Sequence, residues 1–194
     1  MEDSAYPPCG FHGVLEPPFS VAVADGVGGL PGGEVASSIA TRYVEYVYSP
    51  ESFVEEIGRA HLDIQGTFPG SATTLTLALV QREKIDVYWI GDSTALVIFT
   101  DGTYKVLTRP HVHPATGYIL RVLGMGEPVF DNVSIGVHNV HTIMLFTDGL
   151  TAHFSISEIV DMYMNEIDLV QAYLEAGAID NVAIVIAKKY EGCG

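Results

Sequence analysis

The period of the apolar positions changes along the chain. These positions recur every three or four residues over 35–47 and again over 53–64, which predicts two amphipathic helices, and Ser49-Pro50 is a suitable start for the second. Val54 is expected on the buried face of that helix. After residue 72 the apolar runs become short and alternate with polar turns, which predicts strands. The expected strands cover 73–80, 85–90, 95–100, 104–107, 129–137 and 142–146.

More helical sequence follows these strands. Ser155 and Glu158 form a capping box that predicts a helix start, and Asn165 is expected to cap a further helix that ends at Gly177. The side chains expected to pack inward from that helix are Ile167, Val170, Tyr173 and Leu174. A last strand is expected at 182–187. This order predicts an α+β fold rather than alternating β-α-β units, in a single domain over residues 1–194.

Composition and charge narrow the class of protein. With 194 residues, 48% of them hydrophobic, the chain can bury a substantial core. Nine Lys and Arg against 24 Asp and Glu give a net charge of −15, which disfavours nucleic acid and anionic membranes as partners. The acidic start of the chain is unlike a signal peptide, and no apolar run is long enough to span a bilayer, so a cytoplasmic protein is expected. Cys9 and Cys193 are expected to be incidental thiols, without a disulfide or a zinc site.

Acidic residues at four places stand beside apolar runs or glycines: Glu2-Asp3, Asp25, Asp148 and Asp180. Their neighbouring segments are predicted strands, and strand ends that lie side by side bring distant carboxylates to one point. Two unit charges about 4 Å apart repel by roughly 4 kcal/mol at an effective dielectric of 20, so such a cluster needs a cation. Oxygen ligands, including a carbonyl at Gly26, favour a hard ion such as Mg²⁺ or Mn²⁺ over zinc.

A series of short motifs runs nearly from one end of the chain to the other. In order they are Glu2-Asp3-Ser4, Asp25-Gly26-Val27-Gly28-Gly29, Gly70-Ser71-Ala72-Thr73-Thr74, Gly91-Asp92-Ser93, Leu107-Thr108 with His111, Arg121-Val122-Leu123-Gly124, Thr147-Asp148-Gly149-Leu150 and Asp180-Asn181. A lone Asp-Gly pair usually marks only a turn, whereas an ordered series is a strong signal. The series resembles the metal-dependent protein phosphatases, the PPM or type 2C serine/threonine family. That resemblance implies a four-layer αββα sandwich, in which two stacked, mainly antiparallel sheets are flanked by helix pairs.

The resemblance also implies roles for individual residues. Asp25 would bridge two Mg²⁺ or Mn²⁺ ions, with the Gly26 carbonyl on one of them, and Asp148 and Asp180 would hold the other. Glu2-Asp3 would bind from the opposite side through coordinated waters. Asp25, Asp148 and Asp180 are therefore the predicted catalytic residues. A hydroxide between the ions would attack phosphorus in line, without a covalent phosphoenzyme.

Some positions have two interpretations. In the family, the aspartate equivalent to Asp92 can approach a third, more weakly bound ion, but an Asp that begins a hairpin turn is equally natural. His12, His111, His113 and His153 could donate a proton to the leaving group, but an ordinary loop or surface histidine is favoured for all four. Asn181 is expected to hold Asp180 through a local hydrogen bond.

Two departures from the family pattern bear on substrate binding. A phosphate-binding Arg precedes the first acidic motif in the family, and a chain that begins at Met1 has no place for it. Arg42, Arg109 and Arg121 are the candidates to replace it, and the sequence does not select among them. The flap is also reduced to residues 109–120, as expected of a compact, bacterial-type member with an open site.

The leading hypothesis is a Mg²⁺- or Mn²⁺-dependent phosphatase that acts on phosphoserine and phosphothreonine in proteins. It would oppose a serine/threonine kinase in signalling. A non-catalytic binding or regulatory module of the same fold is the main alternative, and a hydrolase of small phosphate esters is another. The missing Arg and the short flap favour these alternatives. The crowded carboxylates favour catalysis, because a binding module does not need them.

Overall fold

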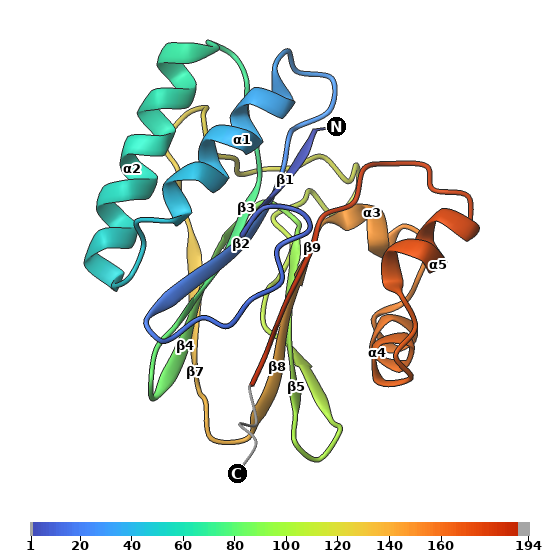
Figure 1. Cartoon of the computed structure of the whole chain (residues 1–194). Helices are drawn as coiled ribbons and strands as arrows, with labels where there is room; N and C mark the ends of the chain where they lie inside the picture. The colour runs from blue at the N-terminus through green and yellow to red at the C-terminus, as the bar shows by residue number, and fades with distance from the viewer. Residues whose placement is uncertain (1, 190–194) are drawn as a thin grey trace.

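Two antiparallel sheets form the centre of the structure, a computed structural model that describes residues 2–189 (Figure 1). In spatial order, the first sheet consists of β1 (Asp3–Tyr6), β2 (Phe19–Asp25), β3 (Leu75–Val80), β4 (Lys84–Ile90) and β7 (Asp131–Gly136). The second consists, in spatial order, of β6 (Tyr104–Val106), β5 (Thr94–Phe99), β8 (Val140–Phe146) and β9 (Ile184–Lys188).

Helices cover the outer face of each sheet. The first sheet is covered by α1 (Gly33–Val44) and α2 (Pro50–Thr67), and the second by α3 (Asp148–Thr151), α4 (Ile156–Met164) and α5 (Leu169–Glu175). Figure 1 shows these helical layers on opposite sides of the stacked sheets. The predicted αββα sandwich is therefore confirmed, with the short α3 added to the second helical layer.

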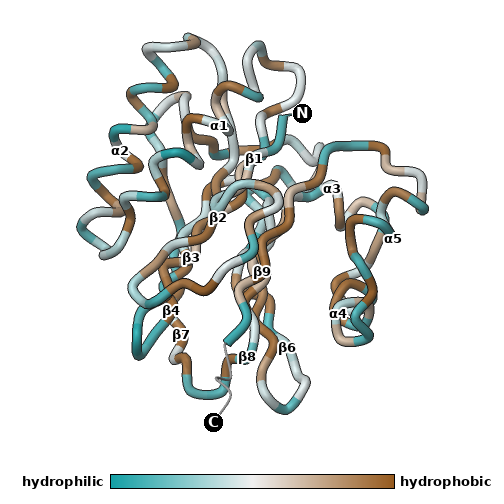
Figure 2. The backbone as a smooth tube through the Cα atoms, viewed as in Figure 1, coloured by the Kyte–Doolittle hydropathy of each residue, from teal (hydrophilic) through white to brown (hydrophobic). Residues whose placement is uncertain are grey.

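The two faces of each central strand pack against different layers. In β2, Val21 and Val23 face the second sheet, whereas Ala22 and Ala24 lie under the helices of the first. The small alanine side chains leave room for α1 to lie close to the sheet. Apolar residues therefore concentrate along the strands, while the helices alternate between apolar and polar positions (Figure 2).

Two predicted helix starts are confirmed. Ser49 caps α2 and exchanges hydrogen bonds with Ser52, and Pro50 occupies the first helical position. The capping box of Ser155 and Glu158 begins α4. Both caps satisfy backbone N–H groups that the first helical turn leaves without partners.

The prediction that Asn165 caps the next helix is wrong. Asn165 ends α4, where its side chain donates to the carbonyl of Asp161 (2.8 Å). Asp168 begins α5, and its carboxylate accepts hydrogen bonds from the N–H groups of Val170 and Gln171. A carboxylate that reaches two free N–H groups makes the stronger cap.

Some apolar side chains expected in the core are exposed instead. Val54 is 72% exposed, because it lies one residue, or about 100°, around α2 from Phe53, at the side of the buried stripe. In α5, Tyr173 is buried as expected, and Leu169 four residues earlier shares its face. The side chains of Ile167, Val170 and Leu174 are about half exposed.

None of the helices within residues 2–189 is long and apolar enough to cross a membrane. Cys9 lies exposed in the loop between β1 and β2. Cys193, the other predicted incidental thiol, lies outside the described residues.

Burial on α2 gives a direct test of the first helical layer. Ile64 is fully buried, so Ile64→Ala should lower the free energy of unfolding by about 2–5 kcal/mol, as expected when a large core side chain is removed. Leu62 lies on the same helix but is 66% exposed, and Leu62→Ala should change stability by only about 0.5 kcal/mol or less. Urea unfolding measures both. Equal effects would contradict the packing of α2.

Candidate metal centre

The first two predicted carboxylates come together where β1 begins and β2 ends. The two strands are antiparallel, and their register places Asp3 directly opposite Asp25. Asp3 is only 4% exposed. Strand pairing alone therefore brings these two aspartates, far apart in the sequence, to the same end of the first sheet.

The backbone of Asp25 is held by two threonines. The N–H of Asp25 donates to Thr74 Oγ1 (2.9 Å), and its carbonyl accepts from Thr73 Oγ1 (2.8 Å) and the Thr74 N–H (2.8 Å). Thr73 also bridges the backbones of Gly26 and Leu123, so the threonine-rich motif is joined to both neighbouring motifs. These bonds hold the main chain and leave the Asp25 carboxylate free for other contacts.

Gly26 allows the start of α1 to lie against the end of β2. A Cβ atom on Gly26 would overlap the backbone of Gly33, so no larger residue fits here. The Gly26 N–H donates to the carbonyl of Glu2 (3.1 Å), which also accepts from Ser37 of α1. The Glu2 carboxylate lies beside Gly33, at the positive end of the α1 dipole.

Thr147 joins the two sheets at this end of the sandwich. Its hydroxyl donates to Asp3 Oδ2 (2.7 Å) and accepts from the N–H of Ala183 (2.9 Å), and the residue is completely buried. Thr147 directly precedes Asp148. Sequence reasoning placed Thr147 in a motif but gave it no role; its position between a strand end and a candidate ligand was the available signal.

The segments that carry Asp148 and Asp180 lie in backbone contact. Asp148 is the first residue of α3, and a Cβ on Gly149 would overlap the carbonyl of Asn181. The N–H of Asn181 donates to Asp180 Oδ1 (2.7 Å), so the expected local hydrogen bond is present and is made by the backbone. This contact brings the second pair of predicted ligands together.

The four aspartates influence one another electrostatically. Burial, followed by the negative charges of Asp3 and Asp148, raises the pKa of Asp25 to about 9. Burial also raises the pKa of Asp3, with smaller contributions from Asp180 and Asp148, although the hydrogen bond from Thr147 opposes this shift. Asp3, Asp25, Asp148 and Asp180 are therefore close enough to feel one another's charge, and the raised pKa of Asp25 marks a place where a proton or another cation is favoured.

Asp92 also belongs to this group. Burial and the nearby charge of Asp148 raise its pKa to about 6, and its Oδ1 is buried without a hydrogen-bond partner among the described residues. The next residue, Ser93, forms a hydrogen bond with Thr74 (3.1 Å), which ties the Asp92 turn to the turn at Asp25. A carboxylate oxygen that only formed a turn would not be left buried and unpaired.

The donor set fits a hard divalent cation. All the candidate groups are oxygens, and the raised pKa values together with the unpaired Asp92 Oδ1 indicate a deficit of positive charge. Within residues 2–189, no three or more His, Cys, Asp or Glu side chains are already arranged around one point as metal ligands. The individual ligand assignments for Glu2, Asp3, Asp25, Gly26, Asp92, Asp148 and Asp180 stay predictions.

His111 lies in a loop, as expected, but it is neither exposed nor without a structural role. Its side chain is buried, and it bonds to both backbone groups of Gly91. The ring Nδ1 accepts from the Gly91 N–H (3.2 Å), and the backbone N–H of His111 donates to the Gly91 carbonyl (2.8 Å). Its Nε2 faces Asp131 (3.2 Å), which also binds Arg121 (2.9 Å). His111 thus fixes the turn that precedes Asp92. His12 and His113 are exposed, as expected.

The structure separates the three candidate phosphate-binding arginines. Arg42 forms an ion pair with Asp63 of α2 (2.8 Å), and it follows Gly33 by nine residues, or about 13 Å along α1. Arg42 therefore lies away from the carboxylates. Arg121 is paired with Asp131, and Arg109 is exposed in the flap.

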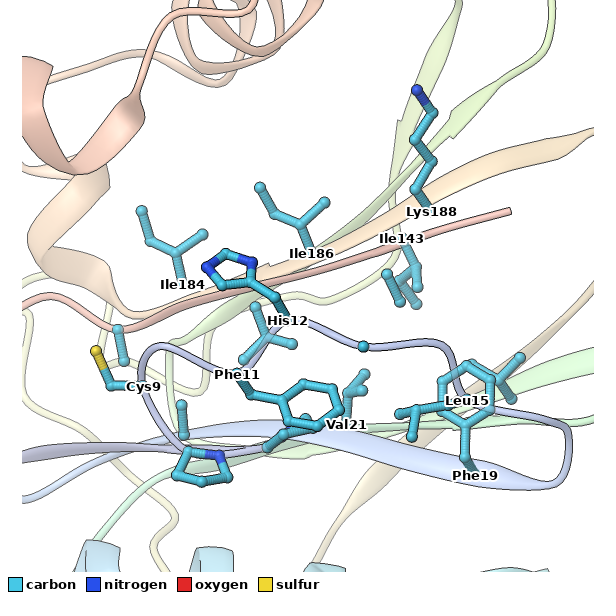
Figure 3. A pocket seen from close by; sticks show the side chains of 18 of the residues that line it. Cys9, Phe11, His12, Leu15, Phe19, Val21, Ile143, Ile184, Ile186 and Lys188 are labelled. Carbon is cyan, nitrogen blue, oxygen red and sulfur yellow. The ribbon is translucent and has the colours of Figure 1, made fainter. Parts of the chain in front are cut away.

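A broad apolar cleft of about 1660 Å³ lies between the β1–β2 loop and the open edge of β9. Figure 3 shows Ile184 and Ile186 of β9 on one side and Phe11 of the loop on the other. Asp3 and Asp180 are among the lining residues, so the cleft reaches the carboxylate cluster. β9 ends its sheet, and its outer edge therefore runs along the cleft.

Comparison with known families identifies this arrangement. The family model of protein phosphatase 2C matches residues 12–178, which is most of the chain. The chain belongs to the protein phosphatase 2C family. The predicted family, the metal-dependent phosphatases, is therefore confirmed. Glu2, Asp3 and Asp180 lie outside the matched range.

Relatives of this phosphatase are bacterial. It is 22% identical to the serine/threonine phosphatase stp of Listeria welshimeri over 212 aligned positions, which cover 87% of this chain and 84% of the relative. It is 24% identical to the serine/threonine protein phosphatase PstP of Mycobacterium tuberculosis, and that match covers 86% of this chain but only 40% of the longer relative.

Solved structures share the fold. The serine/threonine phosphatase Stp1 of Staphylococcus aureus superposes with a TM-score of 0.80 at 21% identity, over 97% of this chain and 89% of that one. The catalytic domain of PstP, solved in complex with two manganese ions, superposes with a TM-score of 0.78 at 23% identity, over 96% of this chain and 90% of that one.

Without metal, this phosphatase should lose stability as the pH rises. The pKa of Asp25 increases from 3.8 to about 9 on folding, so between these values the folded chain holds a proton that the unfolded chain releases. The melting temperature in EDTA should therefore fall between pH 5 and pH 8. Asp25→Asn should make the melting temperature less dependent on pH and raise the melting temperature at pH 8 by several degrees. A change in stability of about 1 kcal/mol corresponds to about 2–4 °C in a domain of this size.

Asp161→Asn provides the matched control, because Asp161 lies exposed on α4, away from the cluster. This variant should keep the wild-type slope. A melting temperature in EDTA that stays level from pH 5 to pH 8 in the wild-type chain would contradict the carboxylate cluster.

Proposed function

We propose that this chain is a Mg²⁺- or Mn²⁺-dependent phosphatase that hydrolyses phosphoserine and phosphothreonine in proteins. The observation that carries the proposal is the buried carboxylate of Asp25 beside Asp3 and Asp148, where burial first and then the two negative charges raise its pKa to about 9. Membership of the protein phosphatase 2C family and the manganese ions in the PstP relative support it.

Two ions are proposed at this site: Asp25 would bind both, and the Gly26 carbonyl would bind one of them. Asp148 and Asp180 would hold one ion, Glu2-Asp3 would bind through waters, and Asp92 would hold a third, weaker ion. When bound, Mg²⁺ or Mn²⁺ would lower the pKa of a coordinated water and neutralise the phosphoryl oxygens as charge develops on them.

The protein's own contribution is to position these groups. Thr73 and Thr74 hold the backbone of Asp25, and Thr147 holds the carboxylate of Asp3. These contacts fix the carboxylates before substrate arrives, so little reorganisation is needed during the reaction. Attack by water in line with the leaving oxygen requires no covalent intermediate on the protein.

A protein substrate is favoured over a small phosphate ester. The listeria and mycobacterial relatives are both named serine/threonine phosphatases, and this outweighs the open site, which would also admit a small ester. A non-catalytic module is disfavoured, because crowded carboxylates destabilise the fold and contribute nothing to simple binding. Opposition to a serine/threonine kinase in cytoplasmic signalling is the corresponding cellular role.

Hydrolysis of a phosphothreonine peptide, measured against Mn²⁺ concentration, tests the proposal. The wild-type rate should rise with Mn²⁺ and disappear in EDTA. Asp25→Ala should lower the rate at least about 100-fold. Removing a group that only orients a metal ligand costs up to about 100-fold, and removing a ligand itself should cost at least as much. Asp161→Asn should retain the wild-type rate. Full Mn²⁺-dependent activity in folded Asp25→Ala would contradict the assignment, and faster hydrolysis of nitrophenyl phosphate than of the peptide would favour the small-ester alternative.

The phosphate-binding group has a separate test. A strand with one Arg, added before Glu2, would have the open edge of β9 and the cleft of Figure 3 beside it. This Arg should lower the KM for the peptide about 10-fold or more, because one hydrogen bond between charged groups contributes about 1.5–3 kcal/mol. The same strand with Ala in place of Arg is the control.

If the Arg strand leaves KM unchanged, another arginine, in the flap or directly after it, binds the phosphate. Arg109→Ala or Arg121→Ala should then raise KM, while Arg42→Ala should not, because Arg42 lies along α1 away from the site.

A further inference from the structure

A single tyrosine side chain satisfies both backbone groups of Asp180. Tyr173 of α5 is 1% exposed, and its hydroxyl accepts a hydrogen bond from the Asp180 N–H (3.0 Å) and donates one to the Asp180 carbonyl (3.0 Å). Two bonds from one hydroxyl to the same residue fix both the position and the orientation of its peptide groups. Asp180 is exposed, and Tyr173 uses neither of its carboxylate oxygens, one of which accepts from the N–H of Asn181.

The same hydroxyl lies at the junction of two ligand-bearing segments. It is 3.5 Å from the place that a Cβ on Gly149 would occupy, and Gly149 itself lies against the carbonyl of Asn181. Gly149 directly follows Asp148, and Asn181 directly follows Asp180. The tyrosine hydroxyl is therefore close to the main chain of both segments while touching neither carboxylate.

The surrounding chain explains why this contact matters. Residues 176–183 connect α5 to β9 without regular structure, and Thr147 holds their far end through Ala183. Tyr173 holds the middle of the segment at Asp180. A ligand on an irregular segment keeps its geometry only if nearby groups hold its backbone.

We propose that Tyr173 is a positioning residue for metal binding by Asp180. This inference rests on the proposed function, because it assumes that Asp180 binds an ion. Tyr173 acts through the backbone of Asp180, and it links the outer helical layer to the metal centre. Loss of the hydroxyl leaves two polar backbone groups of a ligand residue unpaired, while the ring continues to fill the core.

Tyr163 offers a matched control in the same helical layer. It lies on α4, and its hydroxyl forms a hydrogen bond with Thr142 of β8 (2.9 Å). Replacing either tyrosine by phenylalanine removes one hydroxyl that bonds a partner beneath the helices. The two variants differ in whether that partner carries a candidate ligand.

Calorimetric titration with MnCl₂ tests the inference. Tyr173→Phe should weaken Mn²⁺ binding about 10- to 100-fold, the range measured when a group that orients a metal ligand is removed. Tyr163→Phe should bind Mn²⁺ as the wild-type chain does. The Mn²⁺ concentration for half-maximal peptide hydrolysis should rise for Tyr173→Phe, with KM for the peptide unchanged.

A double substitution shows whether Tyr173 acts through Asp180. Adding Tyr173→Phe to Asp180→Asn should not weaken Mn²⁺ binding further, because the positioned ligand is already lost. Additive losses would overturn the inference, and so would equal losses in Tyr173→Phe and Tyr163→Phe, which would indicate a general effect on stability. Unchanged binding in Tyr173→Phe would overturn this inference alone, whereas a wild-type chain that binds no Mn²⁺ would overturn the proposed function as well.

Discussion

Repulsion among buried carboxylates is the main physical constraint at the end of the sandwich that contains Asp25. Burial and two neighbouring negative charges raise the pKa of Asp25 to about 9, so at neutral pH the site favours an added positive charge. The hydrogen bonds to these residues come from neutral groups, such as Thr147 on Asp3 and Thr73 and Thr74 on Asp25. Neutral donors fix the geometry without supplying the charge. The balance of charge is therefore left to an ion.

The clustered aspartates come from both sheets of the sandwich. Strand pairing in the first sheet brings Asp3 opposite Asp25, and the end of β8 in the second leads to Asp148. Thr147 bonds to Asp3 in the first sheet and to Ala183 beside β9. Asp3 and Asp25 are already paired within the first sheet, but Asp148 is brought near them only when the two sheets have stacked. A cation that binds all of them is bound only by the folded chain and stabilises it.

The features that sequence could predict are those that depend on neighbours along the chain. The helical and strand periods and the caps at Ser49 and Ser155 follow from local geometry, and the structure agrees with them. Asn165 and Asp168 are both suitable caps only three residues apart, and the choice between them depends on where α4 ends. Local pattern does not contain that information.

The roles that sequence missed all depend on contacts between distant segments. His111 bonds to Gly91 across 20 residues, and Thr147 bonds to Asp3 across 144. A buried histidine and a loop histidine look the same in sequence, because only tertiary contacts distinguish them. The ordered motifs located the carboxylates, but not the residues that hold them.

These supporting residues follow one physical rule. Thr73 and Thr74 hold the backbone of Asp25, His111 holds the residue before Asp92, and Tyr173 holds the backbone of Asp180. A hydrogen bond to a carboxylate oxygen would occupy a lone pair that an ion needs, whereas a bond to the peptide group leaves both oxygens free. Asp3 and Asp180 each accept one further bond on a carboxylate oxygen, from Thr147 and from the N–H of Asn181. One oxygen of each carboxylate is not used by these bonds, which is enough for a contact to an ion, either direct or, as proposed for Asp3, through water.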